Sequence, residues 1–267
     1  HYAEAKDPAR AAVAMNPRDP WAIHAVTHVF EMQGRHRAGA AWLEGHLEDW
    51  AVDNGFSYHN WFHLALFQLE EMDTPAALEV YDVELASVGE MALQRVDRTA
   101  ILWRLKLLGV DVASRFAAVR DTWSTDVPAA GFYAFNDLHA LIACIGADAG
   151  GSGSATEELL AAIAASASGG STNQRMTRLG GLPLARALPA YGGGRWADAG
   201  DGMLPVRDHA HLFGGSHAQR DVVTLTLIDA AVRAGERALA DHILAERHAA
   251  KQHTPFTAYW RRRVAEA

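Results

Sequence analysis

The sequence has few of the features that would place a chain in a membrane or an oxidising compartment. It contains one cysteine, Cys144, so no intrachain disulfide and no thiolate-rich metal site can form. No run of about 20 apolar residues occurs, which predicts no membrane span. The polar start HYAEAKDPAR has no apolar stretch of the kind found in signal peptides. We therefore expect a cytoplasmic protein that does not use a membrane as a partner.

Basic residues are also in the minority. Lysine and arginine number 24 against 32 aspartates and glutamates, a formal net charge of -8. Because binding to phosphate backbones needs basic surface, nucleic acid is not an expected partner. The sequence also has no nucleophile elbow G-x-S-x-G, no phosphate loop and no dinucleotide fingerprint.

What the chain has in abundance is helix-forming residues, with alanine, leucine, arginine and glutamate frequent throughout. Runs typical of strands are scarce. The nearest one, DVVTLTLIDAAV from Asp221, continues into an alanine-rich pattern and is better interpreted as helix. The sequence predicts an all-α fold.

The helical pattern recurs along the chain in paired units. Each unit has apolar pairs, a turn that is usually glycine, a small residue where the helices cross, and a bulky anchor. The units are WAIHAVTHVFEMQGR with its continuation to Leu43, WFHLALFQLEEMDTPAALEVYD, FNDLHALIACIGA, PLARALPAYGGGRWADAGDGML and VVTLTLIDAAVRAGERALADHILAER, with a weaker pair at 90–109 and 112–123. This pattern resembles a divergent tetratricopeptide repeat. The resemblance predicts a right-handed superhelical α-solenoid.

The domain organisation follows from these repeats. Because helical pairing continues on both sides of two Gly/Ser-rich stretches, 147–155 and 166–173, we predict one repeat domain over residues 1–267. The two stretches are expected to be mobile loops around a short helix at 156–165. The opening segment is typical of a second helix whose partner precedes it, so we expect the native protein to extend further at its N-terminus.

Polar side chains form rows on two of the predicted first helices. His24 and His28 lie four residues apart and Glu31 follows three later, so all three share one helix face. His59 and His63 repeat the four-residue spacing, with Asn60 beside them. In tetratricopeptide modules with this register, such a stripe faces the concave groove.

Two further helices are predicted to carry polar groups near their starts. The first has Asn136, Asp137 and His139, and the second has His217, Arg220 and Asp221. Ser216 and Gln219 have capping-box spacing, which predicts that the second helix begins at Ser216. In a solenoid, first helices stand side by side, so we expect all four rows to meet around one polar pocket.

Three functions are compatible with such a pocket. The first is binding of a small polar or anionic ligand, or a peptide end, through His24, His28, Glu31, His59, Asn60, His63, Asn136, His139, His217, Arg220 and Asp221. The alternative is a metal-dependent enzyme in which His24, His28 and Glu31 hold zinc, iron or manganese, since imidazole and carboxylate suit those ions. A scaffold for protein–protein interaction is the third. The reaction, if any, the ligand and the oligomeric state stay open.

Four stretches resemble one particular family in the same order along the chain. They are WAIHAVTHVFEMQGR, HNWFHLALFQLE, GFYAFNDLHAL and GGSHAQRDV, of which the last is the most specific. The chain is similar in them to the tetratricopeptide repeat protein 38 family and its bacterial relatives. The resemblance implies an α-solenoid, and it implies a longer native chain because family members are longer. It implies no activity.

Overall fold

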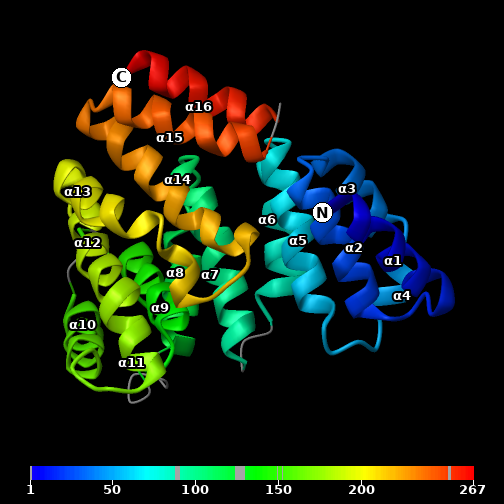
Figure 1. Cartoon of the computed structure of the whole chain (residues 1–267), viewed down its shortest axis with the longest axis horizontal. Coiled ribbons are helices and arrows are strands. Elements are labelled where there is room, and N and C mark those ends of the chain that lie inside the picture. The colour runs from blue at the N-terminus through cyan, green and yellow to red at the C-terminus, as the bar shows by residue number, and fades with distance from the viewer. Residues whose placement is uncertain (1, 88–90, 124–129, 149, 152, 252–253) are drawn as a thin grey trace. The chain divides into compact units, whose positions relative to one another are not determined.

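The computed structural model describes residues 2–87, 91–123, 130–148, 150–151, 153–251 and 254–267, and these residues are predominantly helical (Figure 1). Among them no strand occurs, so the all-α prediction is confirmed. The DVVTLTLIDAAV segment lies inside one α-helix, α14 (His217–Ala234), as expected. No helix in the described part of the chain has the length and apolar character needed to cross a membrane.

The chain forms two compact units. Unit 1 comprises His1–Val88 and Leu244–Glu266, and unit 2 comprises Gly89–Ile243 with Ala267. The helices of unit 1 are α1 (Tyr2–Met15), α2 (Pro20–Met32), α3 (His36–Glu44), α4 (Leu47–Trp50), α5 (Ser57–Glu70), α6 (Thr74–Val80), which a π-helical turn at Tyr81–Leu85 extends, and α16 (Pro255–Glu266). A single repeat domain over residues 1–267 stays a prediction.

Unit 2 holds the remaining helices. They are α7 (Ala92–Leu107), α8 (Ala113–Trp123), α9 (Ala134–Ala147), α10 (Ser154–Ser166), α11 (Thr172–Met176), continued by a π-helical turn at Thr177–Gly181, α12 (Leu182–Gly192), α13 (Trp196–Arg207) and α14. A short 3-10 turn at Ala210–Phe213 precedes α14. Helix α15 (Arg237–Ala250) begins in unit 2 and ends in unit 1.

Five helical hairpins share one turn geometry. The first helix of each ends in a residue with positive φ, and the next amide donates to the carbonyl five residues earlier at 2.9–3.0 Å. This is the Schellman pattern that closes a helix C-terminus. The left-handed residues are Gly34, Met72, Gly109, Gly194 and Gly235. Their recurrence agrees with the repeated hairpins predicted from the sequence, although Met72 occupies a position that favours glycine.

The Gly/Ser-rich stretches are shorter connections than predicted. Helix α10 takes up Ser154 and Ser166, the ends of the two expected loops, and residues 149 and 152 lie outside the described residues. In the second stretch Ser171 caps α11, because its Oγ accepts from the Gln174 amide while the Gln174 side chain accepts from the Ser171 amide. The capping box orders the end of the 166–173 stretch, and the expected mobility of both stretches stays a prediction.

The core of unit 1 requires a close approach between α3 and α5. A Cβ atom added at Gly39 would lie 2.5 Å from the ring of Phe67, which is fully buried. Only glycine lets the two helices meet at this distance, as the sequence pattern of a small crossing residue predicts.

Replacing this glycine tests the packing. Gly39→Ala should lower the free energy of unfolding by about 1–3 kcal/mol, because the methyl group forces Phe67 or the helix to move. Urea denaturation measures the change. Gly55→Ala is the matched control, since a Cβ atom there meets nothing within 4 Å. A Gly39→Ala protein as stable as the Gly55→Ala protein would contradict the packing described here.

Candidate metal centre

Local signals set the start of two helices of unit 1 that carry four histidines. Helix α2 begins where the Asp19 carboxylate accepts from the amides of Trp21 and Ala22, at 2.9 and 3.2 Å, with Pro20 in the first position. Helix α5 begins at Ser57. Each helix then carries two histidines four residues apart, so each pair lies on one face.

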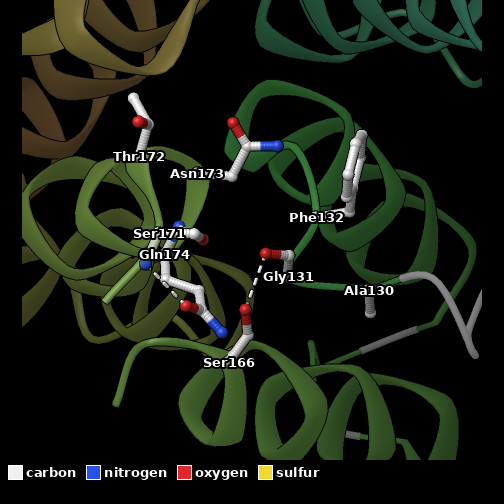
Figure 2. Close-up of a pocket in the computed structure, with 8 residues that line it drawn as sticks. All are labelled: Ala130, Gly131, Phe132, Ser166, Ser171, Thr172, Asn173 and Gln174. Atoms are coloured by element: carbon white, nitrogen blue, oxygen red, sulfur yellow. Dashed lines mark hydrogen bonds between the residues drawn. The ribbon is translucent and has the colours of Figure 1, made fainter. Parts of the chain in front are cut away.

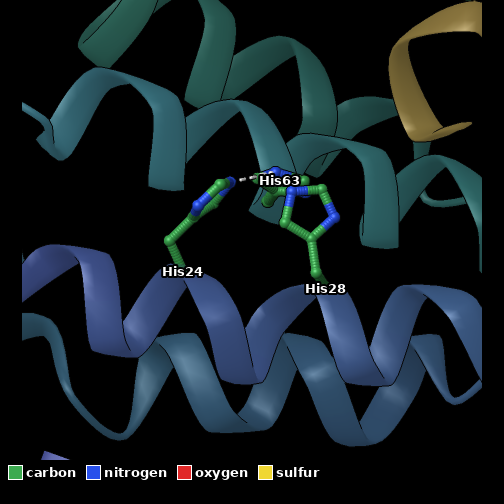
Figure 3. A group of neighbouring side chains, drawn as sticks. All are labelled: His24, His28 and His63. Carbon is green, nitrogen blue, oxygen red and sulfur yellow. Dashed lines mark hydrogen bonds between the residues drawn. The ribbon is translucent and has the colours of Figure 1, made fainter. Parts of the chain in front are cut away.

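Three of these imidazoles meet between the two helices. His24 and His28 extend from α2 toward α5, where His63 lies between them (Figure 3). The Nε2 atoms of His24 and His63 are 3.1 Å apart. One ring nitrogen from each of the three histidines lies within 4.8 Å of the others. Imidazole groups from distant parts of the sequence therefore converge, as predicted, within unit 1.

His59 completes the cluster as a fourth imidazole. Its ring centroid lies 4.9 Å from that of His24 and 4.9 Å from that of His63. It is buried, whereas His24 and His28 are half-buried and His63 is fully buried. The cluster thus has a protein-facing side at His59 and His63 and a more accessible side at His24 and His28.

The environment keeps the central imidazoles neutral. Burial, together with repulsion from the charged forms of the neighbouring His28 and His59, lowers the pKa of His24 to about 2. Burial likewise puts the pKa of His63 well below its ordinary value, with the same kind of contribution from His28, His59 and His24. At neutral pH these rings carry lone pairs rather than charge, which is the form that ligates metals.

Glu31 does not join the histidines, contrary to the expected His24–His28–Glu31 set. Its Oε1 lies 2.5 Å from Nζ of Lys251, and its Oε2 lies 3.7 Å from Nε2 of His36. His63 occupies the third position instead. The expectation failed because Glu31, one turn further along α2, meets an ammonium group that follows it by more than 200 positions in the sequence.

A buried charge network therefore lies next to the imidazole cluster in unit 1. Glu70 accepts from the guanidinium of Arg247 and, at 2.9 Å, from the hydroxyl of Thr254, and Lys251 lies 3.9 Å from the same carboxylate. Burial lowers the pKa of His36, so that ring is neutral while Lys251 and Arg247 balance Glu31 and Glu70. The sequence reasoning missed this network. The spacing of Glu70, seven residues after His63 and thus on its face of α5, was the one available signal.

Asn60 is also fully buried. Neither atom of its amide has a hydrogen-bond partner among the described residues. A buried amide without partners costs about 1–3 kcal/mol. Asn60 lies three residues before His63, on the flank of the same face of α5, and its role as a ligand-binding residue stays a prediction.

The other two predicted rows belong to unit 2. His139 is fully buried, and its Nδ1 lies 2.8 Å from the carbonyl of Phe135. His217 is exposed and Asn136 is half-buried. Of the two predicted histidines in unit 2, His139 is therefore closed off from solvent and His217 is open to it. A single pocket formed by all four rows stays a prediction.

Arg220 binds its own loop. Its Nη1 donates to the carbonyls of Gly214 and Gly215, which precede the helix. Both glycines have positive φ, and a Cβ atom at either would overlap Tyr133 or Phe135. The GGSHAQRD and GFYAFNDLHAL stretches therefore pack on each other.

The same loop sets the start of α14, where the Ser216 and Gln219 capping box confirms the predicted cap. Asp221, the next residue of α14, is buried.

Unit 2 also has an open cavity of about 620 Å³ (Figure 2). It is lined by Ala130, Gly131, Phe132, Ser166, Ser171, Thr172, Asn173 and Gln174. Several of its polar groups already stabilise the backbone: the Ser166 hydroxyl donates to the Gly131 carbonyl, and Gln174 caps α11. None of the residues expected to bind a ligand lines it. The imidazole cluster of unit 1 is therefore the better candidate for a functional site.

Comparison with family models and with solved structures does not identify the chain. No family model matches the chain, and no solved structure matches it. The class of protein defined here is an all-α chain with a three-histidine cluster.

The charge network makes a direct prediction about stability. Lys251→Met should lower the free energy of unfolding by about 3–5 kcal/mol, because it leaves the Glu31 carboxylate buried without its cation. Thermal or urea denaturation measures this.

The matched control is the exposed ion pair Arg37–Glu71, 2.8 Å apart, whose Arg37 side chain is 86% exposed. Arg37→Met should cost at most about 1 kcal/mol. Equal effects of the two substitutions would refute a buried, charge-balanced network.

A pH dependence follows from His139 in unit 2. Burial lowers the pKa of its imidazole to about 4, so between pH 6.5 and 4 the unfolded chain binds a proton that the folded chain does not. Stability from this group is therefore lost as pH falls below 6.5, by about 1.4 kcal/mol per pH unit. Asp137, whose pKa burial raises to about 6, acts in the opposite direction below pH 6.

Comparing urea denaturation of the parent protein and His139→Asn between pH 7 and 5 isolates the histidine. The variant should be less stable at pH 7 but lose less stability on acidification. Parallel curves would show that His139 is not held neutral.

Proposed function

We propose that the protein binds one divalent transition-metal ion through His24, His28 and His63. The observation that carries this proposal is the approach of three imidazoles whose ring nitrogens lie within 4.8 Å of one another. Lowered pKa values at His24 and His63 support it, because neither ring must lose a proton to bind metal at neutral pH.

Zinc fits this donor set best. Zinc–nitrogen bonds of about 2.0–2.1 Å in a tetrahedral site separate two ligand nitrogens by about 3.3 Å. The 3.1 Å between the Nε2 atoms of His24 and His63 is close to that separation. Iron and manganese, also considered from the sequence, are less favoured because Glu31, the carboxylate expected to bind them, is paired with Lys251.

Three protein ligands leave one tetrahedral position for water or another ligand, as in catalytic rather than structural zinc sites. We expect that position on the side of the half-buried His24 and His28. A metal bound there would supply a Lewis acid and lower the pKa of bound water. His59 lies on the protein-facing side, with its ring centroid 4.9 Å from those of His24 and His63. The open position supports a ligand-binding or hydrolytic role for the site.

The fold proposal accompanies the function. We propose that the hairpins are divergent tetratricopeptide-like repeats of a superhelical solenoid, in a cytoplasmic relative of the tetratricopeptide repeat protein 38 family. The recurring Schellman turns and the glycine contact between α3 and α5 support the repeat assignment.

Cobalt titration of untagged protein tests the metal site, because tetrahedral cobalt absorbs visible light and substitutes for zinc. We expect one cobalt ion per chain in the parent protein. His63→Ala should weaken binding at least about 100-fold, more than loss of an outer hydrogen-bond partner of a ligand costs. The control, His211→Ala, removes an exposed histidine of unit 2 and should leave binding unchanged.

Two results would overturn the proposal. One is the absence of a stoichiometric cobalt spectrum in the parent protein. The other is unchanged cobalt affinity in a folded His63→Ala protein, with folding checked by circular dichroism.

A further inference from the structure

An exposed aromatic pair lies at the edge of the imidazole cluster. The indole of Trp21 stacks on the ring of Phe56, with centroids 4.0 Å apart and planes 25° from parallel. Trp21 is nevertheless 63% exposed, whereas Trp50, Trp103 and Trp260 are fully buried. Phe56 thus covers part of the indole, and a large aromatic surface stays open to solvent.

This pair lies against His24, one of the proposed ligands, and against His59 beside it. The Phe56 ring lies 5.1 Å from that of His24 and 5.2 Å from that of His59. The indole of Trp21 lies 6.2 Å from the ring of His24, edge to face. Trp21 is the second residue of α2 and Phe56 immediately precedes α5, so the Asp19 cap that starts α2 also positions Trp21.

The charge of a metal ion bound at the three imidazoles determines which kind of ligand atom the site favours. All three ligands of the proposed site are imidazoles, with no carboxylate among them, so a divalent ion bound there would keep its positive charge and attract an anionic oxygen ligand. A group attached to that ligand on the accessible side meets the open surface of Trp21. Stacking on an aromatic surface adds about 0.5–1.5 kcal/mol to such a complex.

We infer that Trp21 and Phe56 form a subsite for the aromatic or flat apolar part of an organic acid whose anionic head binds the metal. The inference rests on the proposed metal site and specifies the class of molecule that the site takes.

Two hydroxamates that differ only in the attached group test the subsite. Benzohydroxamate and acetohydroxamate share the metal-binding head, and their affinities for the cobalt-loaded protein are measured from the visible spectrum. The ratio of the two affinities should fall about 2- to 10-fold in Trp21→Ala, because the phenyl group loses its stacking partner. Trp21→Phe should keep most of the ratio. Met15→Ala, which removes another exposed apolar side chain of unit 1, should keep all of it.

The outcomes separate the two proposals. An unchanged ratio in Trp21→Ala, with a normal cobalt spectrum, would overturn the subsite and leave the metal site standing. If the parent protein shows no cobalt spectrum, the metal site fails and the subsite fails with it. A ratio that falls equally in Met15→Ala would also overturn the subsite, because the effect would not belong to the indole.

Discussion

The site depends on one contact, the approach of the His24 and His63 imidazoles to 3.1 Å between α2 and α5. Two charged imidazoles would repel each other at this distance, so the contact requires that burial keep the rings neutral. It also requires that both helices start at the correct residue, because a shift of one position rotates a side chain by about 100°. The Asp19 cap and Pro20 provide that start for α2.

A network of buried charges lies further along the same two helices. Glu31 and Glu70 are buried carboxylates, and Lys251 and Arg247 bring the balancing charges from the C-terminal segment of unit 1. A buried ion pair is weak evidence for stability by itself, but removing one partner is costly. Both carboxylates have cations from the same C-terminal segment, which ties α2 and α5 to that segment.

The features that the sequence predicted correctly are those encoded by local spacing. Four-residue histidine pairs, the Ser216 capping box and the helical hairpins need only neighbours within one or two turns. Glu31 was misplaced because its partner, Lys251, is remote in the sequence and carries no motif. At Met72 and Ser171, composition alone is misleading. Met72 adopts a left-handed conformation that usually favours glycine, within a hydrogen-bonded turn, and a capping box orders the turn at Ser171 in a Gly/Ser-rich stretch. The sequence predicted that the histidines of α2 and α5 would converge, but which imidazoles meet depends on how the two helices pack.

Long-range proton–nitrogen NMR correlations of the imidazole rings test the central claim most directly, because they report charge and tautomer separately for each histidine. Spectra of the metal-free protein at pH 5.5, assigned with single substitutions, should show His24 and His63 neutral. Adding one equivalent of zinc should shift His24, His28 and His63 together. Charged His24 and His63 at that pH, with no coordinated shift on adding zinc, would contradict the account.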